Sequence, residues 1–202
     1  NLALAVLSMF ERLHTRGILM ADVNPRNIMV DQEDPSKVYF IDVDSYQVGT
    51  DARNGYACLV SRQEFLSNRL LDKDFGSGTV FRDMDDELYA ITTLLFTIFL
   101  PEIFPYARRG EGNLEQLNRE RRFVFPNGYT DNGEVHRGAE SLWYELPKPM
   151  CVAFYETFKD GRFHDIEEWR ELIEDYKEEI LNNRKSSVIY PSEAPGRSVP
   201  IF

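Results

Sequence analysis

Cysteine and histidine are scarce in this sequence of 202 residues. The only cysteines, Cys58 and Cys151, stand far apart and form no C-x-x-C pair, which argues against a disulfide framework and against a structural zinc site. A reducing, cytoplasmic compartment fits this usage. His136 has no second His or Cys at ligand spacing, so we expect a solvated histidine rather than a metal ligand.

Basic residues and long apolar runs are also lacking. The 23 Lys and Arg against 34 Asp and Glu leave a formal net charge of −11. Binding to nucleic acids or to anionic membranes calls for clustered Lys and Arg, so we expect neither as a partner. The longest apolar run, Leu88 to Leu100, is too short and too rich in Thr to span a bilayer comfortably. No stretch has the charged, apolar and small-residue zones of a signal peptide.

What is present is enough apolar material for one globular domain with a sizeable core, since 43% of the residues are hydrophobic and 13% aromatic. Leu2, Val6 and Phe10 recur at helical spacing, which predicts a helix from Asn1 to Thr15 that ends at Gly17. Because the sequence begins with Asn rather than Met and is helical from its first residues, we expect it to be a fragment of a longer protein.

Three polar residues able to hold a metal-bound phosphate lie in one stretch, residues 13–48; they are Asp22, Asn27 and Asp42. Asn27 opens the short apolar run NIMV, the polar turn DQEDPSK follows, and VYFI leads directly into Asp42. This pattern predicts a β-hairpin that brings Asn27 and Asp42 close together. Asp22 precedes the hairpin on a loop that Pro25 keeps out of a helix, so its carboxylate is expected to face the same point.

The pattern D-x-x-P-x-N, followed by an apolar strand ending in I-D, is that of the protein kinase catalytic lobe, and the chain resembles this lobe. Closer still is the resemblance to a bacterial group of kinase-like proteins, whose motifs read roughly D-[VI]-N-P-x-N and I-D-x-D-S-[FY]-Q; here they stand at residues 22–27 and 41–47. The resemblance implies Ser/Thr protein kinase activity with ATP and Mg²⁺ as cofactors and an unidentified protein as substrate. Asp22 would then accept the proton of the substrate hydroxyl, while Asn27 and Asp42 would bind the magnesium ions that bridge the phosphates.

The chain departs from the kinase pattern on both sides of Asp22. Met20 and Ala21 replace the usual H-R pair, so the Arg that answers a phosphate on the activation segment is absent, and we do not expect switching by that route. Asn24 stands where kinases carry a Lys that helps to neutralise the transferring phosphate; a neutral amide can hydrogen-bond but supplies no charge. The kinase-like group has Asn at this place, which keeps a catalytic role for Asn24 open.

Residues 48–85 have no clear period and resemble an activation segment. They contain the literal string D-F-G at residues 74–76, which we reject as a metal motif because no apolar strand precedes it. We also interpret Gly76-Ser77-Gly78 as a surface turn rather than a phosphate-binding loop.

Arg69 falls where the family has a Glu that pairs with a later Arg, here Arg162. Two facing cations would repel each other. We therefore expect another acid to replace the missing Glu, the candidates being Glu64, Asp72 and Asp74.

The string DDELYAITTLLFTIFLP predicts a helix from Asp85, buried on all sides, that ends at Pro101 and resembles the central helix of the kinase lobe. Glu87 aligns with the Asp that braces the catalytic loop in that family. Asp85 or Asp86 could also do so, and the alternative is that these acids only favour the positive end of the helix.

In the rest of the chain, residues 110–138 are polar and are expected to form surface loops, and PMCVAFYETF predicts a helix. Asp165 with Glu168 forms a capping box that opens a last helix. Past Asn182 the chain becomes polar and Pro-containing, so we predict a domain over residues 1–182 and a tail or linker over residues 183–202. The predicted fold class is mainly α (α+β): a kinase-like C-terminal lobe with a small β-hairpin at the catalytic loop.

Three functions remain open at this point. The first is phosphoryl transfer from ATP to protein Ser/Thr hydroxyls. The second is a pseudokinase that binds nucleotide or a partner without transfer, favoured by Asn24, Arg69 and the absent H-R pair. The third is a small-molecule kinase, against which the long segment of residues 48–85 argues.

No glycine-rich strand-turn-strand or paired strand Lys precedes Asn1, so the smaller, N-terminal kinase lobe is expected to be missing. This chain alone is therefore expected to bind ATP weakly and transfer little.

Overall fold

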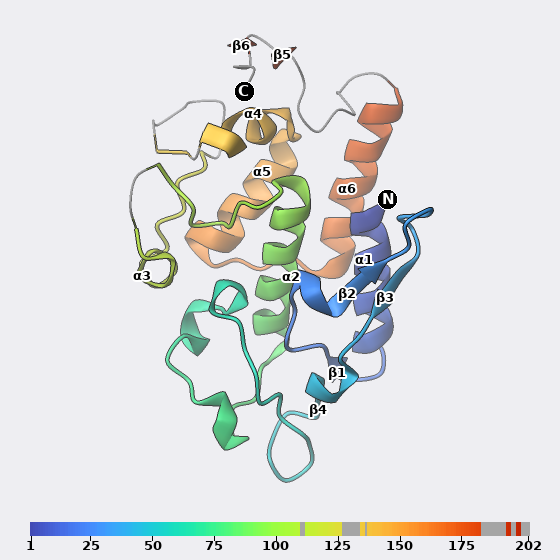
Figure 1. The fold of residues 1–202 in the computed structure, drawn as a ribbon, viewed down its shortest axis with the longest axis vertical. Helices are drawn as coiled ribbons and strands as arrows, with labels where there is room; N and C mark the ends of the chain where they lie inside the picture. Colours follow the sequence, from blue (N-terminus) through green and yellow to red (C-terminus); the bar gives the residue numbers. More distant parts are fainter. Residues whose placement is uncertain (110–111, 127–133, 136, 183–192, 195–196, 199–202) are drawn as a thin grey trace. The chain divides into compact units, whose positions relative to one another are not determined.

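The computed structural model describes the chain except for residues 110–111, 127–133, 136, 183–192, 195–196 and 199–202. It divides into two compact units (Figure 1). The first unit comprises Asn1–Leu95 and Phe163–Arg170, and the second comprises Phe96–Arg162 and Glu171–Phe202. Every residue of the predicted site lies in the first unit.

Helices dominate the described residues, and each paired sheet is a small two-stranded one, so the expectation of a mainly helical α+β fold is confirmed at that level. The helices are α1 (Leu2–His14), α2 (Met84–Phe99), α3 (Leu114–Arg119), α4 (Arg137–Glu145), α5 (Lys148–Tyr155) and α6 (Ile166–Leu181). The strands are β1 (Ile18–Leu19), β2 (Ile28–Val30), β3 (Val38–Phe40), β4 (Gln47–Val48), β5 (Glu193–Ala194) and β6 (Arg197–Ser198).

Helix α1 opens the first unit and confirms the prediction made for residues 1–15. Its apolar stripe is buried, including Val6, Leu7 and Phe10. The helix gives way to Gly17, whose φ of 68° is in the left-handed region that glycine adopts without steric cost.

Strands β2 and β3 form the predicted antiparallel hairpin, with Met29 opposite Tyr39 and Ile28 opposite Phe40. The hairpin lies along α1 (Figure 1), where the rings of Phe40 and Phe10 meet edge to face at a centroid distance of 4.7 Å. This contact holds the hairpin on the helix and so sets the place where the chain leaves β3.

Helix α2 is buried from Asp86 to Phe96 without interruption, which confirms the prediction of a helix enclosed on all sides. Within the first unit, the indole nitrogen of Trp169 donates a hydrogen bond of 3.1 Å to the hydroxyl of Thr92. The predicted capping box before α6 is also present, since the Asp165 and Glu168 side chains each accept the other residue's backbone N–H at 2.9 Å.

The second unit is built around aromatic rings. The ring of Phe96 lies 5.2 Å from that of Phe125 and 5.2 Å from that of Phe154, measured between centroids. The expectation of surface loops over residues 110–138 is therefore wrong in part, because Phe123 and Phe125 are buried and α3 is a helix. The three consecutive apolar residues of FVF are buried, and both Phe rings pack on Phe96, far away in the sequence, which the polarity of the neighbouring residues did not indicate. The prediction for His136 lies outside the described residues.

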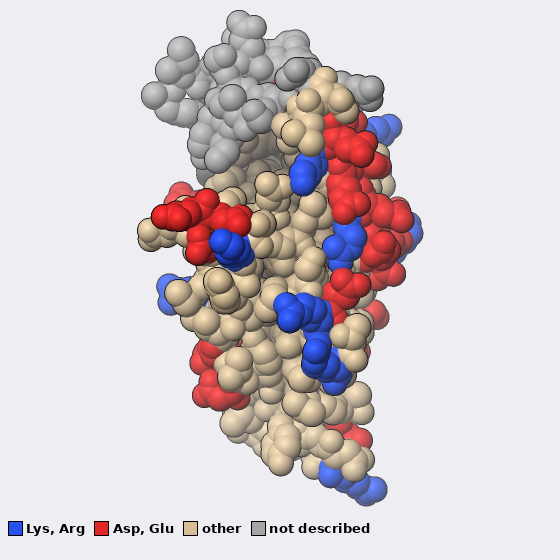
Figure 2. Space-filling view, turned by 90° about the vertical axis from the view of Figure 1, so that its right-hand side faces the viewer, with Lys and Arg blue, Asp and Glu red and all other residues tan. Residues whose placement is uncertain are grey.

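The predicted tail also falls largely outside the described residues, apart from the β5–β6 pair, so the boundary near Asn182 stays a prediction. No helix among the described residues is both long and apolar enough to cross a membrane. Acidic side chains outnumber basic ones on the face shown in Figure 2, in keeping with the net charge of −11.

Candidate functional site

The loop that carries Asp22 is held by a carboxylate from α2. The backbone N–H groups of Met20 and Ala21 donate to the two oxygens of Glu87, at 2.7 and 3.0 Å. Glu87 is completely buried, and the imidazole of His14 lies 3.5 Å from one of its oxygens. Of the three acids that the sequence offered for this role, Glu87 is the one that braces the loop. Ala21 takes a left-handed φ of 63°, which turns the chain toward Asp22.

Asp22 is buried and accepts hydrogen bonds from two neighbouring amides. The Nδ2 atoms of Asn24 and Asn27 lie 3.1 and 3.0 Å from its Oδ2 atom. The same two amides donate to the backbone carbonyl of Asp22, at 2.9 and 3.0 Å. Its carboxylate is thereby fixed in one orientation, with Oδ1 as the oxygen that these amides do not use.

Asn24 is fully engaged inside the loop. Besides donating to Asp22, it accepts the backbone N–H of Arg26 at 3.0 Å through its Oδ1 atom, and so caps the short turn Pro25–Asn27. The amide of Asn24 therefore orients Asp22, which the sequence did not indicate. A local signal for the cap was available, because an Asn side chain often accepts the backbone N–H two residues further along in a turn.

Asp42 arrives beside this loop through the hairpin. The backbone N–H of Ile41 donates to the carbonyl of Asn27 at 3.0 Å, so the predicted approach of the two segments is confirmed at the backbone. Asp42 itself has φ 60° and ψ 47°, a left-handed conformation that Asp tolerates, and its side chain is exposed. The carbonyl of Asp42 accepts the Ser45 hydroxyl at 2.8 Å, which closes the turn that follows.

The electrostatics around Asp42 favour a cation. A side-chain hydrogen bond and the negative charge of Asp44 raise the pKa of the Asp42 carboxyl, and the charge of Asp22 adds to this. Neighbouring carboxylates repel one another, and a bound cation would reduce this repulsion. The Oδ1 atom of Asn27 and the carboxylate of Asp42 are hard oxygen donors, which suit Mg²⁺.

The described residues contain no group of three or more His, Cys, Asp and Glu side chains placed to hold a metal ion. A magnesium ion at Asn27 and Asp42 would therefore take its other ligands from water and phosphate. This is the usual coordination of Mg²⁺ in phosphate-transferring sites, where one or two protein ligands suffice. The donor set fits the ion that the resemblance implies.

The string Asp74-Phe75-Gly76 has no part in this site. Phe75 begins a short 3-10 turn, Phe75–Ser77, and its ring is buried against Leu66, Leu70 and Leu71. Residues 49–73, all of them described, contain turns and an isolated bridge at Tyr56 but no strand. The lack of a strand before this string, which is the reason for rejecting it as a metal motif, is confirmed over these residues, and residues 76–78 form the expected turn.

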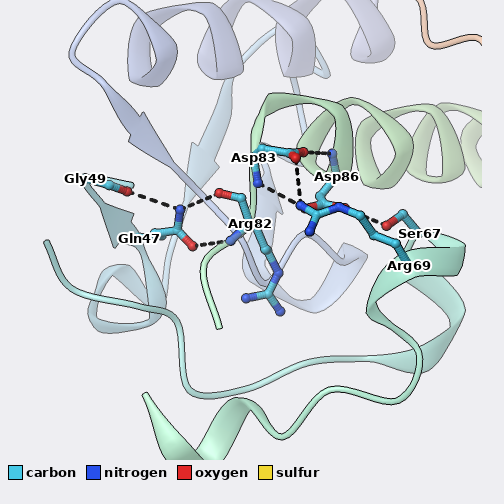
Figure 3. Close-up of polar contacts among 7 residues, drawn as sticks. All are labelled: Gln47, Gly49, Ser67, Arg69, Arg82, Asp83 and Asp86. Atoms are coloured by element: carbon cyan, nitrogen blue, oxygen red, sulfur yellow. Dashed lines mark hydrogen bonds and ion pairs between the residues drawn. The ribbon is translucent and has the colours of Figure 1, made fainter. Parts of the chain in front are cut away.

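Arg69 pairs with acids at the start of α2. Its guanidinium forms ion pairs with Asp83, at 2.8 Å, and with Asp86 (Figure 3). The hydroxyl of Ser67 donates to Asp86 at 2.6 Å, and burial raises the pKa of the Asp86 carboxyl. The acids that pair with Arg69 thus come from the start of α2, and the expectation that Glu64, Asp72 or Asp74 replaces the missing Glu stays a prediction. Arg162 pairs with Glu156 in the second unit, at 3.1 Å.

No protein-family model matches the chain, and no curated protein matches it at a significant level. The likeness to kinases rests on the motifs around Asp22 and Asp42.

Proposed function

We propose that this chain carries the catalytic residues of an ATP-dependent phosphotransferase acting on protein Ser/Thr hydroxyls. The observation that carries the proposal is the arrangement of Asp22 and Asn27. The amide nitrogen of Asn27 donates to the carboxylate of Asp22, which leaves the amide oxygen of Asn27 for a cation. The hairpin brings the backbone just before Asp42 against Asn27.

Asp22 acts as the base in this proposal. Its Oδ2 atom is occupied by the amides of Asn24 and Asn27, so Oδ1 is the oxygen available to a substrate hydroxyl. A carboxylate held in one rotamer can align the hydroxyl for attack and accept its proton as the new bond forms. Glu87 supports this orientation from behind through the backbone of Met20 and Ala21.

Asn27 and Asp42 would hold magnesium. When bound, the ion neutralises charge on the phosphates of ATP. The raised pKa of Asp42, caused first by Asp44, supports this assignment because it marks a point of negative potential on an exposed surface.

A pseudokinase is the second candidate, and Asn24 is the observation that favours it. Kinases place a Lys at this position, whereas both polar atoms of the Asn24 amide are used within the loop. Position 24 therefore supplies no positive charge to the transferring phosphate. Such a protein would bind nucleotide or a partner and transfer nothing.

The test is transfer of labelled phosphate from ATP with Mg²⁺, catalysed by the protein translated from the whole reading frame that contains this sequence. Asp22→Asn and Asp42→Asn should each abolish transfer. Asp74→Asn is the matched control, since it removes the carboxylate of the literal D-F-G string and should leave transfer intact. The proposal fails if the unsubstituted protein transfers nothing; a melting temperature that ATP still raises would then favour the pseudokinase.

A further inference from the structure

Gln47 is a buried amide at the junction of three segments. It lies in β4, where it pairs with Leu19 of β1, and only 1% of its surface is exposed. Its Nε2 atom donates to the carbonyl of Arg82 at 2.7 Å, and its Oε1 atom accepts the N–H of Arg82 at 2.8 Å (Figure 3). The same Nε2 atom lies 3.3 Å from the carbonyl of Gly49. The Gln47 amide thus bonds both the N–H and the carbonyl of Arg82, as the backbone of a neighbouring strand would.

The two hydrogen bonds between the Gln47 side chain and the Arg82 backbone, here called the Gln47 clamp, hold the far end of the segment that carries Asp42. Before Asp42, the chain is tied to the Asp22 loop through the bond from Ile41 to Asn27. After Asp42, β4 pairs with β1 over only two residues, so the backbone ladder there is short. Val48 also forms a bridge with Tyr56, and the two hydrogen bonds of Gln47 to Arg82 add to these backbone pairings a link from the far end of the segment to the start of α2.

Arg82 leads directly into the helix that holds the Asp22 loop. Asp83 and Asp86 cap the start of α2 reciprocally, each accepting the other's backbone N–H at 3.0 Å. Glu87 follows one residue later and accepts the backbone N–H groups before Asp22. Asp22 and Asp42 are thus both fastened to the same helix start, one through Glu87 and the other through Gln47.

We propose that Gln47 is a positioning residue that fixes Asp42 relative to Asp22 by clamping β4 to the backbone of Arg82. Its catalytic meaning rests on the proposed function, because the distance between the base and the metal ligand matters only if phosphate is transferred. The effect of Gln47 on the backbone does not depend on phosphate transfer. Without its amide, the segment around Asp42 should open more often while the rest of the first unit keeps its fold.

Gln47→Met is the variant that tests it, because the Met side chain has a similar length and makes neither hydrogen bond. Thr92→Val is the matched control, since it removes another buried side-chain hydrogen bond of the first unit, the one from Trp169. Backbone hydrogen exchange is then followed at Ile41 and Ser45, whose N–H groups donate to Asn27 and Asp42. We expect exchange about tenfold faster at both amides in Gln47→Met and unchanged in Thr92→Val.

Gln47→Leu serves as a second variant in case Gln47→Met folds poorly. It also removes both hydrogen bonds to Arg82 without burying a charge, so its exchange rates should match those of Gln47→Met. Exchange at Ile41 and Ser45 that changes no more than in Thr92→Val would overturn the positioning role.

Binding of Mn²⁺ separates this proposal from the proposed function. Paramagnetic broadening of the amide signals near Asn27 and Asp42 should appear in the wild type at lower Mn²⁺ concentration than in Gln47→Met. If the wild type shows no broadening there, the metal site of the proposed function is wrong, and hydrogen exchange still decides the role of Gln47. If both proteins show broadening at the same concentration, Gln47 does not position Asp42 for a cation.

Discussion

Replacing Glu87 by Gln should loosen the loop of Asp22 and lower the free energy of unfolding. The carboxylate accepts two backbone N–H groups, those of Met20 and Ala21. An amide has a single acceptor oxygen, so one N–H group loses its partner and faces an NH₂ group instead. Buried hydrogen bonds to a charged group contribute about 1.5–3 kcal/mol, and we expect the free energy of unfolding to fall by about 2 kcal/mol.

The effect should extend from Glu87 to Asp22. Ala21 is held at a φ of 63°, a conformation that costs a non-glycine residue about 1–2 kcal/mol. When the bond from its N–H group is lost, Ala21 can relax to an ordinary backbone conformation, and the adjacent Asp22 moves with it. Glu87→Gln should thus lower the rate of any phosphate transfer as well as the stability.

Urea denaturation of the wild type and of Glu87→Gln measures the change in stability, and Glu64→Gln is the control because Glu64 is exposed. For a chain of this size, about 2 kcal/mol corresponds to a melting temperature lower by about 4–8 °C. Hydrogen exchange at Met20 and Ala21 should also accelerate in Glu87→Gln. A difference from wild type below about 0.5 kcal/mol, as surface substitutions give, with both amides still protected, would refute the bracing role.

Three further outcomes can be checked by standard measurements. Arg69→Met should lower the free energy of unfolding by about 1 kcal/mol at neutral pH, a modest loss because Arg69 is half exposed. That loss should shrink as the pH falls through the pKa of Asp86, which burial raises, because a neutral carboxyl needs no cation; a loss that is constant with pH would contradict this pairing. Asp165→Ala removes the cap bond to the Glu168 N–H and should lower the unfolding free energy by about 1 kcal/mol, whereas unchanged thermal melting would refute the capping role. Cys58 should react with a thiol reagent far more slowly in the folded chain than in urea, because burial covers its sulfur and raises its thiol pKa; equal rates would show that it is accessible.

Local patterns determined much of this fold. The helix over residues 1–15, the hairpin before Asp42 and the capping box at Asp165 depend on periodicity, turn residues and caps, which act within a few positions of the chain. The placement of Asn27 and Asp42 at neighbouring points followed from the same reasoning, because a hairpin brings its two ends together whatever surrounds it.

Contacts between distant residues were decided only by the tertiary structure. The sequence allowed three acids to brace the Asp22 loop, and the packing of α2 selects Glu87, which lies 67 positions from Met20. It did not indicate that Arg69 pairs with Asp83 and Asp86, and it left Phe123 and Phe125 in a surface loop. The clamp of Gln47 on Arg82 joins residues 35 positions apart. A side chain's partner across such a separation depends on which segments pack together, and that is set by burial over the whole unit rather than by any local pattern.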